Sequence, residues 1–561
     1  MLARIPSRGL VPTRSGLAAS PTSSTLFRRF ASTSSQSLDD REFRIGIVGG
    51  GPAGFYAASR LLSLPGSSRV NVDLFELLPT PFGLARFGVA PDHPEVKNCE
   101  HKFEETARDP RFRYFGNVQV CGTSPSELGP DAASPSSSSS TIVPNLSPSS
   151  VAVQVPLSSL QSHYDAVLLT YGASLDRPLG IAGEFELENV LSARSFVNWY
   201  NGHPYHSSLL APSLDLSQVR HVTIIGQGNV ALDVARVLLK PVDELREFDV
   251  PDYALAELSR SRVERVEVVG RRGVLQLAAT TKELREMMNL DRVGFDGIDG
   301  ATMKDAQAWV GKLGTEGRAK KRALGLLDKG SVTPRATADK SWSLEFLKSP
   351  RELVPVDGAA GASTPVSFES LSVPPKKVGS IVYDLNELAP PEADAESGDP
   401  SRFVARRTGQ TQTVATDMVF KSVGYRSIGI PGLPFDERRG VVKNIDGRVI
   451  NDDGETIQGL YTSGWLARGP NGVIATTMFN AFSTADLIAA DLAAATTTTT
   501  RAAKASRRDV DDLIETYRGD KRVVDWSAWE QIDRVEKERG MAKGKLREKI
   551  TSVEEMLKVI E

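Results

Sequence analysis

The sequence predicts an α/β protein that contains two nucleotide-binding units of the Rossmann type. The stretch "RIGIVGGGPAGFYAASRLL" starts at Arg44, and "VTIIGQGNVALDVARVLL" starts at Val222. Each predicts a buried strand, a tight glycine turn and an amphipathic helix, which is the pattern of a phosphate-binding unit. A further buried strand follows each helix, and such alternation is typical of a parallel sheet with helices on its faces. With 561 residues, 40% hydrophobic and 24% charged, the chain has room for two or three ordinary globular domains.

The first 38 residues have the composition of a mitochondrial transit peptide. They contain no aspartate or glutamate and many serines and threonines. Their basic residues are Arg4, Arg8, Arg14, Arg28 and Arg29. A disordered basic tail is the alternative. We therefore expect a mitochondrial protein, in the matrix or associated with the inner membrane, and a cleavage site near the "RRFAS" that starts at Arg28.

The N-terminal glycine loop (residues 49–54) has the G-x-G-x-x-G spacing. Gly49 makes the tight turn, Gly51 lets a pyrophosphate approach the backbone, and Gly54 lets the helix pack close to the strand. The N-terminus of that helix offers unpaired N–H groups to an anion. Glu76 ends the next strand, where a carboxylate accepts hydrogen bonds from a ribose hydroxyl and repels a 2′-phosphate. The loop therefore predicts a dinucleotide without a 2′-phosphate, most naturally FAD; for Glu76 a solvated carboxylate is the alternative.

The inner glycine loop (residues 226–231) has the variant spacing G-x-G-x-x-A. The next strand ends in "GRRG", so that Arg271 and Arg272 stand where the first unit has an acid. Guanidinium groups suit a 2′-phosphate, and the second nucleotide is therefore predicted to be NADP(H). The distance along the chain exceeds the usual spacing of about 20 residues, so the intervening residues are expected to form an inserted helical excursion. Two solvated arginines are the alternative.

Other segments are less regular. Residues 123–150 are rich in serine and proline and are expected to form a surface insertion. Residues 331–375 are expected to be irregular, and "DMVFKSVGY" from Asp417 predicts a strand. The run "AAATTTTT" that ends at Thr500 is expected to be a linker. A charged helical tail, interrupted at Gly540, is expected to follow it.

The two predicted nucleotides point to hydride transfer between a nicotinamide and a flavin. Such a transfer needs proximity and orientation more than an acid or a base, so no catalytic residue is assigned. Two cysteines without a C-x-x-C motif argue against a redox dithiol, and no metal site is expected from the closest histidines, His203 and His206. A net charge of −3 does not favour nucleic-acid binding. No apolar run is long enough for a transmembrane helix, which leaves only peripheral membrane association open.

Five longer blocks carry a resemblance to a known family. They are "PFGLARFGVAPDHPEVKN", "GQGNVALDVAR", "VGRRGVLQLAATTKELRE", "SGWLARGPNGVIATT" and "WEQIDRVEKERGMAKGKLREK". Together they resemble the adrenodoxin reductase family of mitochondrial NADPH:ferredoxin oxidoreductases, flavoproteins of the EC 1.18.1 class. The resemblance implies a glutathione-reductase-like fold, in which an FAD domain (residues 41–179 and 426–561) surrounds an inserted NADP domain (residues 180–425). The insertion at 123–150 and the segment at 331–375 depart from the family pattern.

The resemblance also implies roles for single residues. The residues that look like FAD contacts are Gly49, Gly51, Ala53, Gly54, Glu76, Leu84, Val120, Trp465, Gly472, Val473 and Ile474. Those that look like NADP contacts are Gln227, Gly228, Asn229, Val230, Arg271, Arg272, Glu283 and Gly472. His93 and Asp233 are candidates for electron transfer or for coupling to the partner, with loop packing and helix polarity as the alternatives.

The partner that the resemblance implies is a small acidic [2Fe–2S] ferredoxin, which serves iron–sulfur cluster assembly, cytochrome P450 electron transfer or both. Lys282, Arg285, Arg318 and Arg322 match the basic docking segments of the family; a solvated charged face is the alternative. Steering by charge predicts that ferredoxin reduction depends strongly on salt. An electron-input flavoprotein of the glutamate-synthase small-subunit type would bring more cysteine ligands than two. A non-catalytic nucleotide sensor is the remaining alternative.

Overall fold

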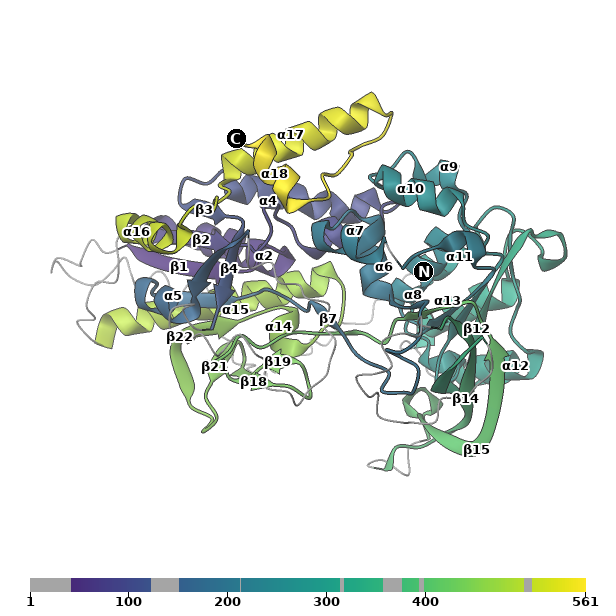
Figure 1. Cartoon of the computed structure of the whole chain (residues 1–561). Helices are drawn as coiled ribbons and strands as arrows, with labels where there is room; N and C mark the ends of the chain where they lie inside the picture. Colours follow the sequence, from purple (N-terminus) through teal and green to yellow (C-terminus); the bar gives the residue numbers. More distant parts are fainter. Residues whose placement is uncertain are drawn as a thin grey trace, which may run out of the picture.

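The computed structural model describes residues 42–122, 151–211, 213–312, 317–356, 376–392, 398–498 and 507–561. Two separate sheets, each flanked by helices, form two units that lie side by side (Figure 1). The α/β prediction is therefore confirmed. The predicted transit peptide and the predicted insertion at 123–150 lie outside the described residues. No helix among the described residues has both the length and the apolar character that crossing a bilayer requires.

The first unit is built on a seven-stranded sheet with the order β20-β21-β22-β6-β1-β2-β3. Its strands are β1 (Phe43–Val48), β2 (Val70–Phe75), β3 (Phe112–Phe115), β6 (Ala166–Leu169), β20 (Asn444–Ile445), β21 (Arg448–Ile450) and β22 (Thr456–Thr462). The neighbours of β1 and β6 are all parallel, and β1 is buried almost throughout, as a near-continuous apolar strand should be. The sheet thus joins two regions of the chain that are far apart in sequence.

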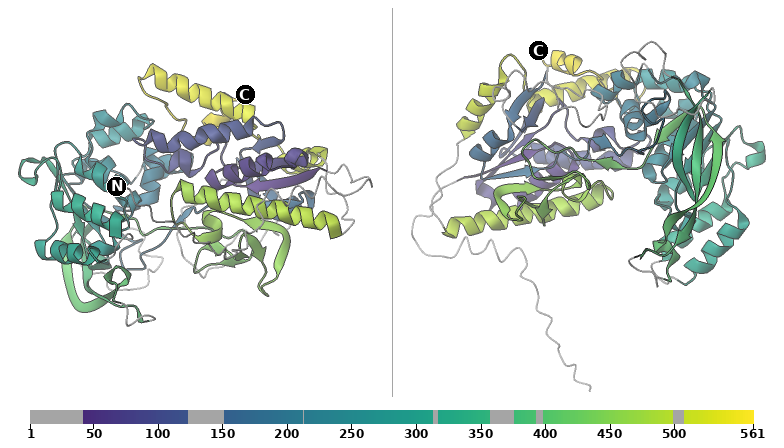
Figure 2. Two further views of the ribbon diagram at one scale, coloured as in Figure 1. Left: turned by 180° about the vertical axis from the view of Figure 1, so that it is seen from behind. Right: turned by 60° about the horizontal axis from the view of Figure 1, so that its bottom comes forward.

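Helices from both regions cover this sheet. Helix α2 (Pro52–Ser63) and helix α15 (Ile474–Thr498) pack along each other (Figure 2). The remaining elements are α3 (Leu84–Phe87), α4 (Cys99–Ala107), β4 (Val118–Cys121), β5 (Val153–Pro156), α5 (Leu157–His163), β18 (Phe435–Asp436), β19 (Val441–Val442), α14 (Trp465–Arg468), α16 (Arg507–Arg518), α17 (Trp526–Ala542) and α18 (Val553–Val559).

The second unit has a six-stranded, fully parallel sheet with the order β11-β12-β10-β9-β16-β8. Its strands are β8 (Val190–Ser192), β9 (His221–Ile225), β10 (Arg265–Val269), β11 (Val293–Phe295), β12 (Lys340–Glu345) and β16 (Met418–Lys421). Its helices are α6 (Ala193–Tyr200), α7 (Pro204–Leu210), α8 (Asn229–Leu239), α9 (Val242–Leu245), α10 (Asp252–Ser259), α11 (Thr281–Met288), α12 (Gly300–Val310) and α13 (Gly317–Lys329). Helices α9 and α10 are the predicted helical excursion.

An antiparallel sheet of β13 (Lys348–Pro355), β14 (Val378–Ala389) and β15 (Val404–Ala415) packs against the second unit. Ile381 and Tyr383 of β14 are buried against the ends of the parallel strands. The expectation that residues 331–375 are irregular is therefore wrong where the structure describes them. Strand β12 was not predicted because two of its buried residues, Ser341 and Ser343, are polar. They interrupt the apolar run that usually marks a central strand.

The two units are joined by a short ladder. Strand β7 (Leu175–Asp176) pairs antiparallel with β17 (Tyr425–Arg426). The chain enters the second unit through β7 and leaves it through β17, so that the second unit is an insertion into the first. The predicted boundaries, between residues 179 and 180 and between residues 425 and 426, lie close to this ladder.

Two expectations about the C-terminal region are wrong. The predicted linker begins inside helix α15, which continues to Thr498, because alanine is the strongest helix former and nothing before that residue breaks the helix. The helical tail is not interrupted at Gly540, which lies within α17. A Cβ atom on Gly540 would lie 2.5 Å from the Cα atom of Arg547, so glycine is required there by close packing of the following segment.

Candidate functional site

The N-terminal glycine loop joins β1 to α2, as predicted. A Cβ atom on Gly49 would lie 2.6 Å from the backbone of Tyr171, and one on Gly54 would lie 2.2 Å from the carbonyl oxygen of Gly49. A Cβ atom on Gly51, in contrast, would have no neighbour within 4 Å. Helix α2 begins after Gly51 without a side-chain cap, which leaves its first N–H groups free for an anion. The open space and the uncapped helix fit a pyrophosphate.

Glu76 follows β2 and turns towards this loop. Its Oε2 atom accepts a hydrogen bond of 2.6 Å from the N–H of Gly50, and its Oε1 atom accepts one of 3.0 Å from the N–H of Leu78. Burial raises the pKa of Glu76, although the backbone hydrogen bonds act in the opposite direction. The carboxylate is therefore held at the edge of the open space beside Gly51, where a ribose would lie.

Several predicted FAD contacts lie around the same loop. The N–H of Phe82 donates to the carbonyl oxygen of Gly50 (2.7 Å), which brings the segment before Leu84 onto the loop. Ala53 lies against Gly464, where an added Cβ atom would be 2.8 Å from the Cβ atom of Ala53. Trp465 follows directly and begins α14. Segments near the two ends of the described chain thus meet at one place.

The remaining predicted flavin contacts lie at the start of α15 and on β4. Gly472 has a φ of 83°, which allows the tight turn before the helix, and Val473 is 54% exposed. Ile474 begins α15, as expected for a loop that presents a helix N-terminus. Val120 is half-buried on β4, whose first residue bonds to the carbonyl oxygen of Glu76.

The inner glycine loop joins β9 to α8 in the same way. A Cβ atom on Gly226 would lie 2.1 Å from the carbonyl oxygen of Ser422, whereas one on Gly228 would have no neighbour within 4 Å. Helix α8 also begins without a side-chain cap. This loop therefore offers a second place for a pyrophosphate.

The side chains of the inner loop point in different directions. The Nε2 atom of Gln227 donates to the carbonyl oxygens of Val268 (3.1 Å) and Glu345 (2.9 Å), at the ends of β10 and β12. The Oδ1 atom of Asn229 accepts a hydrogen bond from the N–H of Thr280 (2.8 Å). Val230 is half-buried against the core of the second unit. The side chains of these residues thus brace the loop, and its backbone is left for a ligand.

Arg271 and Arg272 do not end the strand, as the sequence suggested, but follow it. Strand β10 stops at Val269, because Gly270 turns the chain out of the sheet and both arginines are exposed. They line a hollow of about 450 Å³. Its other lining residues are Ser349, Asn386, Val404, Ala405 and Arg407. Among the described residues, no carboxylate forms an ion pair with Arg271 or Arg272.

Glu283 lies away from this hollow. It is buried on α11 and accepts a hydrogen bond from the hydroxyl of Thr280. Burial raises its pKa, and the nearby carboxylates of Asp233 and Glu286 act in the same direction. Its role at the adenosine phosphate stays a prediction.

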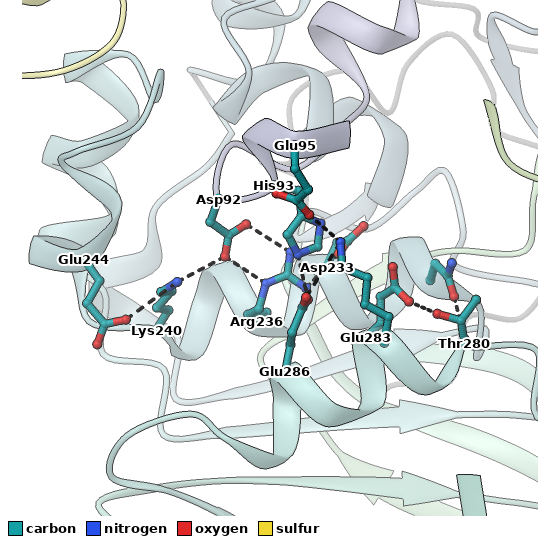
Figure 3. A network of polar contacts seen from close by, with 12 residues as sticks. Asp92, His93, Glu95, Asp233, Arg236, Lys240, Glu244, Thr280, Glu283 and Glu286 are labelled. Carbon is teal, nitrogen blue, oxygen red and sulfur yellow. Dashed lines mark hydrogen bonds and ion pairs between the residues drawn. The ribbon is translucent and has the colours of Figure 1, made fainter. Parts of the chain in front are cut away.

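The two units meet in a buried polar network around Arg236 (Figure 3). The guanidinium of Arg236 on α8 binds Asp92 of the first unit through two hydrogen bonds of 2.9 and 3.0 Å. It also lies 2.8 Å from Asp233 and 3.3 Å from Glu286. The Nε2 atom of His93 lies 2.6 Å from Glu286. His93 and Asp233 are thus brought into one network that bridges the units.

The positive charge of Arg236 shifts the pKa values of the carboxylates in this network. Burial favours the protonated form of Asp92, but the hydrogen bond and the charge of Arg236 outweigh it and hold the pKa of Asp92 well below its usual range. Burial raises the pKa of Asp233, against the pull of Arg236. Sequence reasoning missed Asp92, Arg236 and Glu286. The one local signal was the spacing of three between Asp233 and Arg236, which places both on one helix face.

The predicted docking residues divide into two groups. Arg285 on α11 and Arg318 and Arg322 on α13 are exposed, and α11 packs against α13. Lys282 is instead half-buried and lies 2.6 Å from Glu95 of the first unit. We refer to Arg285, Arg318 and Arg322 as the α11–α13 basic face.

The geometry defines a class of protein: an α/β dinucleotide-binding protein with two glycine loops, one per unit, each between a central parallel strand and a helix without a side-chain cap. No protein-family model matches the chain. A Drosophila melanogaster protein named mitochondrial NADPH:adrenodoxin oxidoreductase is 41% identical over 551 residues, which cover 95% of this chain and 98% of that protein. The Bos taurus protein of the same name is 38% identical over 538 residues, 93% of each chain.

A solved structure agrees with these relatives. FprA of Mycobacterium tuberculosis in complex with NADPH is 34% identical, with a TM-score of 0.73 over 93% of this chain and all of that one. The chain belongs to the NADPH:adrenodoxin oxidoreductase family. The resemblance seen in the sequence is therefore confirmed.

Proposed function

We propose that this protein transfers electrons from NADPH through FAD to a mitochondrial [2Fe–2S] ferredoxin of the adrenodoxin type. The observation that carries the proposal is the pair of uncapped helix N-termini with opposite charges beside them, Glu76 in one unit and Arg271 with Arg272 in the other. A carboxylate suits a plain ribose and paired guanidiniums suit a 2′-phosphate. The names of the relatives, NADPH:adrenodoxin oxidoreductase, support the same assignment.

In this proposal the first unit holds FAD. The N–H groups at the start of α2 bind the pyrophosphate, and Glu76 accepts a hydrogen bond from the ribose. The turn at Gly472 places Val473 and the start of α15 at the flavin end, where backbone N–H groups stabilise negative charge. FAD, when bound, takes a hydride from NADPH and gives up its electrons one at a time.

The second unit holds NADPH. The start of α8 binds its pyrophosphate, and Arg271 and Arg272 bind its 2′-phosphate. The network of Asp92, Arg236 and Glu286 holds the second unit against the first, and hydride transfer requires a fixed relative orientation of the two nucleotides.

The ferredoxin is expected to dock on the α11–α13 basic face. An acidic partner is attracted to exposed guanidiniums, and Arg285, Arg318 and Arg322 have no ion pair among the described residues. Lys282 is a weaker candidate, because Glu95 already lies against it. The network beside Lys282 links this face to the junction between the units.

The relatives are named as mitochondrial proteins. We propose the same compartment for this protein, with residues 1–38 as the transit peptide and the matrix as the final location. Peripheral association with the inner membrane is compatible with the proposal. The electrons then serve iron–sulfur cluster assembly, cytochrome P450 electron transfer or both.

An anaerobic titration tests this proposal. The chain without residues 1–38 is purified, and NADPH is added while the visible flavin absorbance is followed. A [2Fe–2S] ferredoxin and cytochrome c are then added at low and at high salt. We expect bleaching of the flavin, and cytochrome reduction that needs ferredoxin and falls as salt rises. No bound flavin, or flavin that NADPH does not reduce, would leave a nucleotide sensor as the better interpretation.

The docking face is tested by charge reversal. Arg285→Glu with Arg322→Glu is expected to raise the KM for ferredoxin about tenfold at low salt, because two favourable interactions of the encounter become repulsive. Flavin bleaching by NADPH stays unchanged. Arg534→Glu on α17 with Lys558→Glu on α18 is the matched control, since both residues are also exposed but lie on the first unit. An equal effect of the control would mean that overall charge, and not this face, governs the encounter.

A further inference from the structure

The hollow beside Arg271 and Arg272 has a second wall, which the antiparallel sheet supplies. Asn386 lies on β14 and Arg407 lies opposite it on β15, as direct cross-strand partners. Both line the hollow together with Ala405, which is on the same face of β15 as Arg407. The small side chain of Ala405 leaves room between this wall and the two arginines.

Asn386 ties this wall to the loop that carries the arginines. Its Nδ2 atom donates to the carbonyl oxygen of Arg271 (3.0 Å) and to the Oγ atom of Ser349 (2.9 Å). The N–H of Asn386 also donates to the carbonyl oxygen of Leu347. The N–H of Leu347 in turn donates to the carbonyl oxygen of Arg272 (3.2 Å). Strand β14, which pairs with the strand of Arg407, is therefore tied to the loop of the arginine pair by hydrogen bonds.

Arg407 forms an ion pair with a buried carboxylate. Its Nε atom lies 3.1 Å from Asp384, whose side chain is 7% exposed, whereas the side chain of Arg407 is 70% exposed. The strand pairing shifts between Asp384 and Asn386, which brings Asp384 beside Arg407 and not directly opposite it. Asp384 does not line the hollow. It can fix one edge of the guanidinium while the rest faces the hollow.

The charges of the hollow are unbalanced. Among the residues that the structure describes, three arginines line it and no aspartate or glutamate does. Positive side chains gathered around one hollow attract an anion to it. A phosphate monoester, with close to two negative charges and three acceptor oxygens, matches three guanidiniums that approach from two sides.

We propose that Arg407 is a third residue that recognises the 2′-phosphate of NADP(H), opposite Arg271 and Arg272, and that it sets the preference for NADP(H) over NAD(H). The proposal rests on the proposed function, since it assigns the inner unit to NADP(H). Asn386 is a positioning residue: it holds Arg271 and the cross-strand position of Arg407 in register. The antiparallel sheet thereby becomes part of the nucleotide site and not only a cover for the core.

Equilibrium binding of 2′,5′-ADP and 5′-AMP to the FAD-loaded protein tests this role. The two probes differ only in the 2′-phosphate. We expect Arg407→Gln to weaken 2′,5′-ADP about 3- to 10-fold, a modest effect because the side chain is largely exposed. Binding of 5′-AMP should not change. Arg407→Lys should retain part of the affinity, because it keeps the charge but loses the fork of the guanidinium.

Arg351→Gln is the matched control. Arg351 also lies beside Asp384, at 3.5 Å, but it does not line the hollow. It should leave the affinities for both probes unchanged. In turnover, Arg407→Gln should lower kcat/KM for NADPH by the same factor, without changing kcat at saturating NADPH or the rate with NADH.

Equal weakening of both probes by Arg407→Gln, an unchanged affinity for 2′,5′-ADP, or an equal effect of Arg351→Gln would each overturn the role of Arg407. In these cases bleaching of the flavin by NADPH in the wild-type protein would still support the proposed function. A wild-type protein that binds 2′,5′-ADP no more tightly than 5′-AMP would overturn both.

Discussion

The two glycine loops have the same strand–turn–helix backbone but are held in place by different side chains. In the N-terminal loop a side chain comes from the neighbouring strand: Glu76 accepts a hydrogen bond from the N–H of Gly50. In the inner loop the side chain belongs to the loop itself: Gln227 donates to the carbonyl oxygens that end β10 and β12. Both arrangements leave the helix N-terminus open to an anion.

This difference explains why the charge beside each loop can differ. Because Glu76 braces the loop and is also the residue that we propose for the ribose, its charge is tied to the fold. In the second unit Gln227 holds the loop in place, so no side chain after the next strand is needed for that purpose. Arg271 and Arg272 therefore remain exposed in the hollow. The choice of ribose substituent is thus coupled to the fold in the first unit and independent of it in the second.

The largest expected effect separates the glycines that the fold needs from those that a ligand needs. Gly54→Ala and Gly226→Ala each place a methyl group within 2.2 Å of a backbone oxygen, so we expect a loss of about 3 kcal/mol or more in the free energy of unfolding. Gly51→Ala and Gly228→Ala add a methyl group in open space. They should keep the melting temperature of the nucleotide-free protein and lose nucleotide binding. Thermal denaturation measures the stability of each variant, and titrations with FAD and with 2′,5′-ADP measure nucleotide binding. Full FAD binding by Gly51→Ala would contradict the prediction.

The next effect concerns the arginine pair. The double variant Arg271→Gln with Arg272→Gln is expected to lower kcat/KM for NADPH about a hundredfold, because two charge-assisted interactions with the 2′-phosphate are lost. The FAD content and the rate with NADH should not change, since neither depends on that phosphate. Steady-state kinetics with both nucleotides gives the answer. A parallel fall with NADH would show that the arginines act on the fold and not on the phosphate.

A smaller effect is expected from Glu76→Gln. Glutamine keeps an acceptor oxygen for the loop but loses the charge, so FAD affinity should fall about tenfold while the preference for NADPH stays the same. Glu345→Gln is the control, because Glu345 also ends a strand of a parallel sheet but lies in the second unit. FAD dissociation is followed by the recovery of free flavin fluorescence. Equal dissociation from both variants would mean that Glu76 has no special place at the ribose.

The smallest effect is a pH dependence that comes from Glu76. Burial raises the pKa of Glu76, so this side chain takes up a proton at a higher pH than an ordinary glutamate. FAD affinity, which uses the carboxylate, should therefore fall a few-fold as the pH is lowered, and the fall should begin above the pH at which an ordinary glutamate is protonated. The stability of the FAD-free protein should move the other way, since a raised carboxyl pKa adds stability at low pH that is lost as the pH rises through it. The part of each trend that comes from Glu76 is the difference between the wild-type protein and Glu76→Gln, and an absence of any difference would contradict the prediction.

The parts of the fold that could be predicted are those whose signal is local. A strand, a glycine turn and a helix occupy consecutive residues, so both loops and the positions of Glu76, Gly228 and Gly472 could be read from the sequence. Strand β12 could not, because its serines are buried only through the packing of the surrounding sheet.

The parts of the site that were missed depend on long-range contacts. Asp92 and Arg236 are far apart in sequence and belong to different units, and nothing local marks them as partners. Lys282 looked like a free docking residue because Glu95, which neutralises it, comes from the other unit. Arg407 was not identified because it lies on the last strand of a three-stranded sheet whose first strand, β13, falls in a segment that was expected to be irregular.

The ladder of β7 and β17 gives the inserted unit a modular character. Because Asp176 pairs with Tyr425 and Leu175 with Arg426, the cassette between them begins and ends at one point on the surface of its host. Excision of the cassette would leave two neighbouring ends that a tight turn could close, and the cassette itself could be circularised. A single recombination event that inserts one gene into another can produce this arrangement. The same ladder is the place at which the inserted unit can be removed by protein engineering.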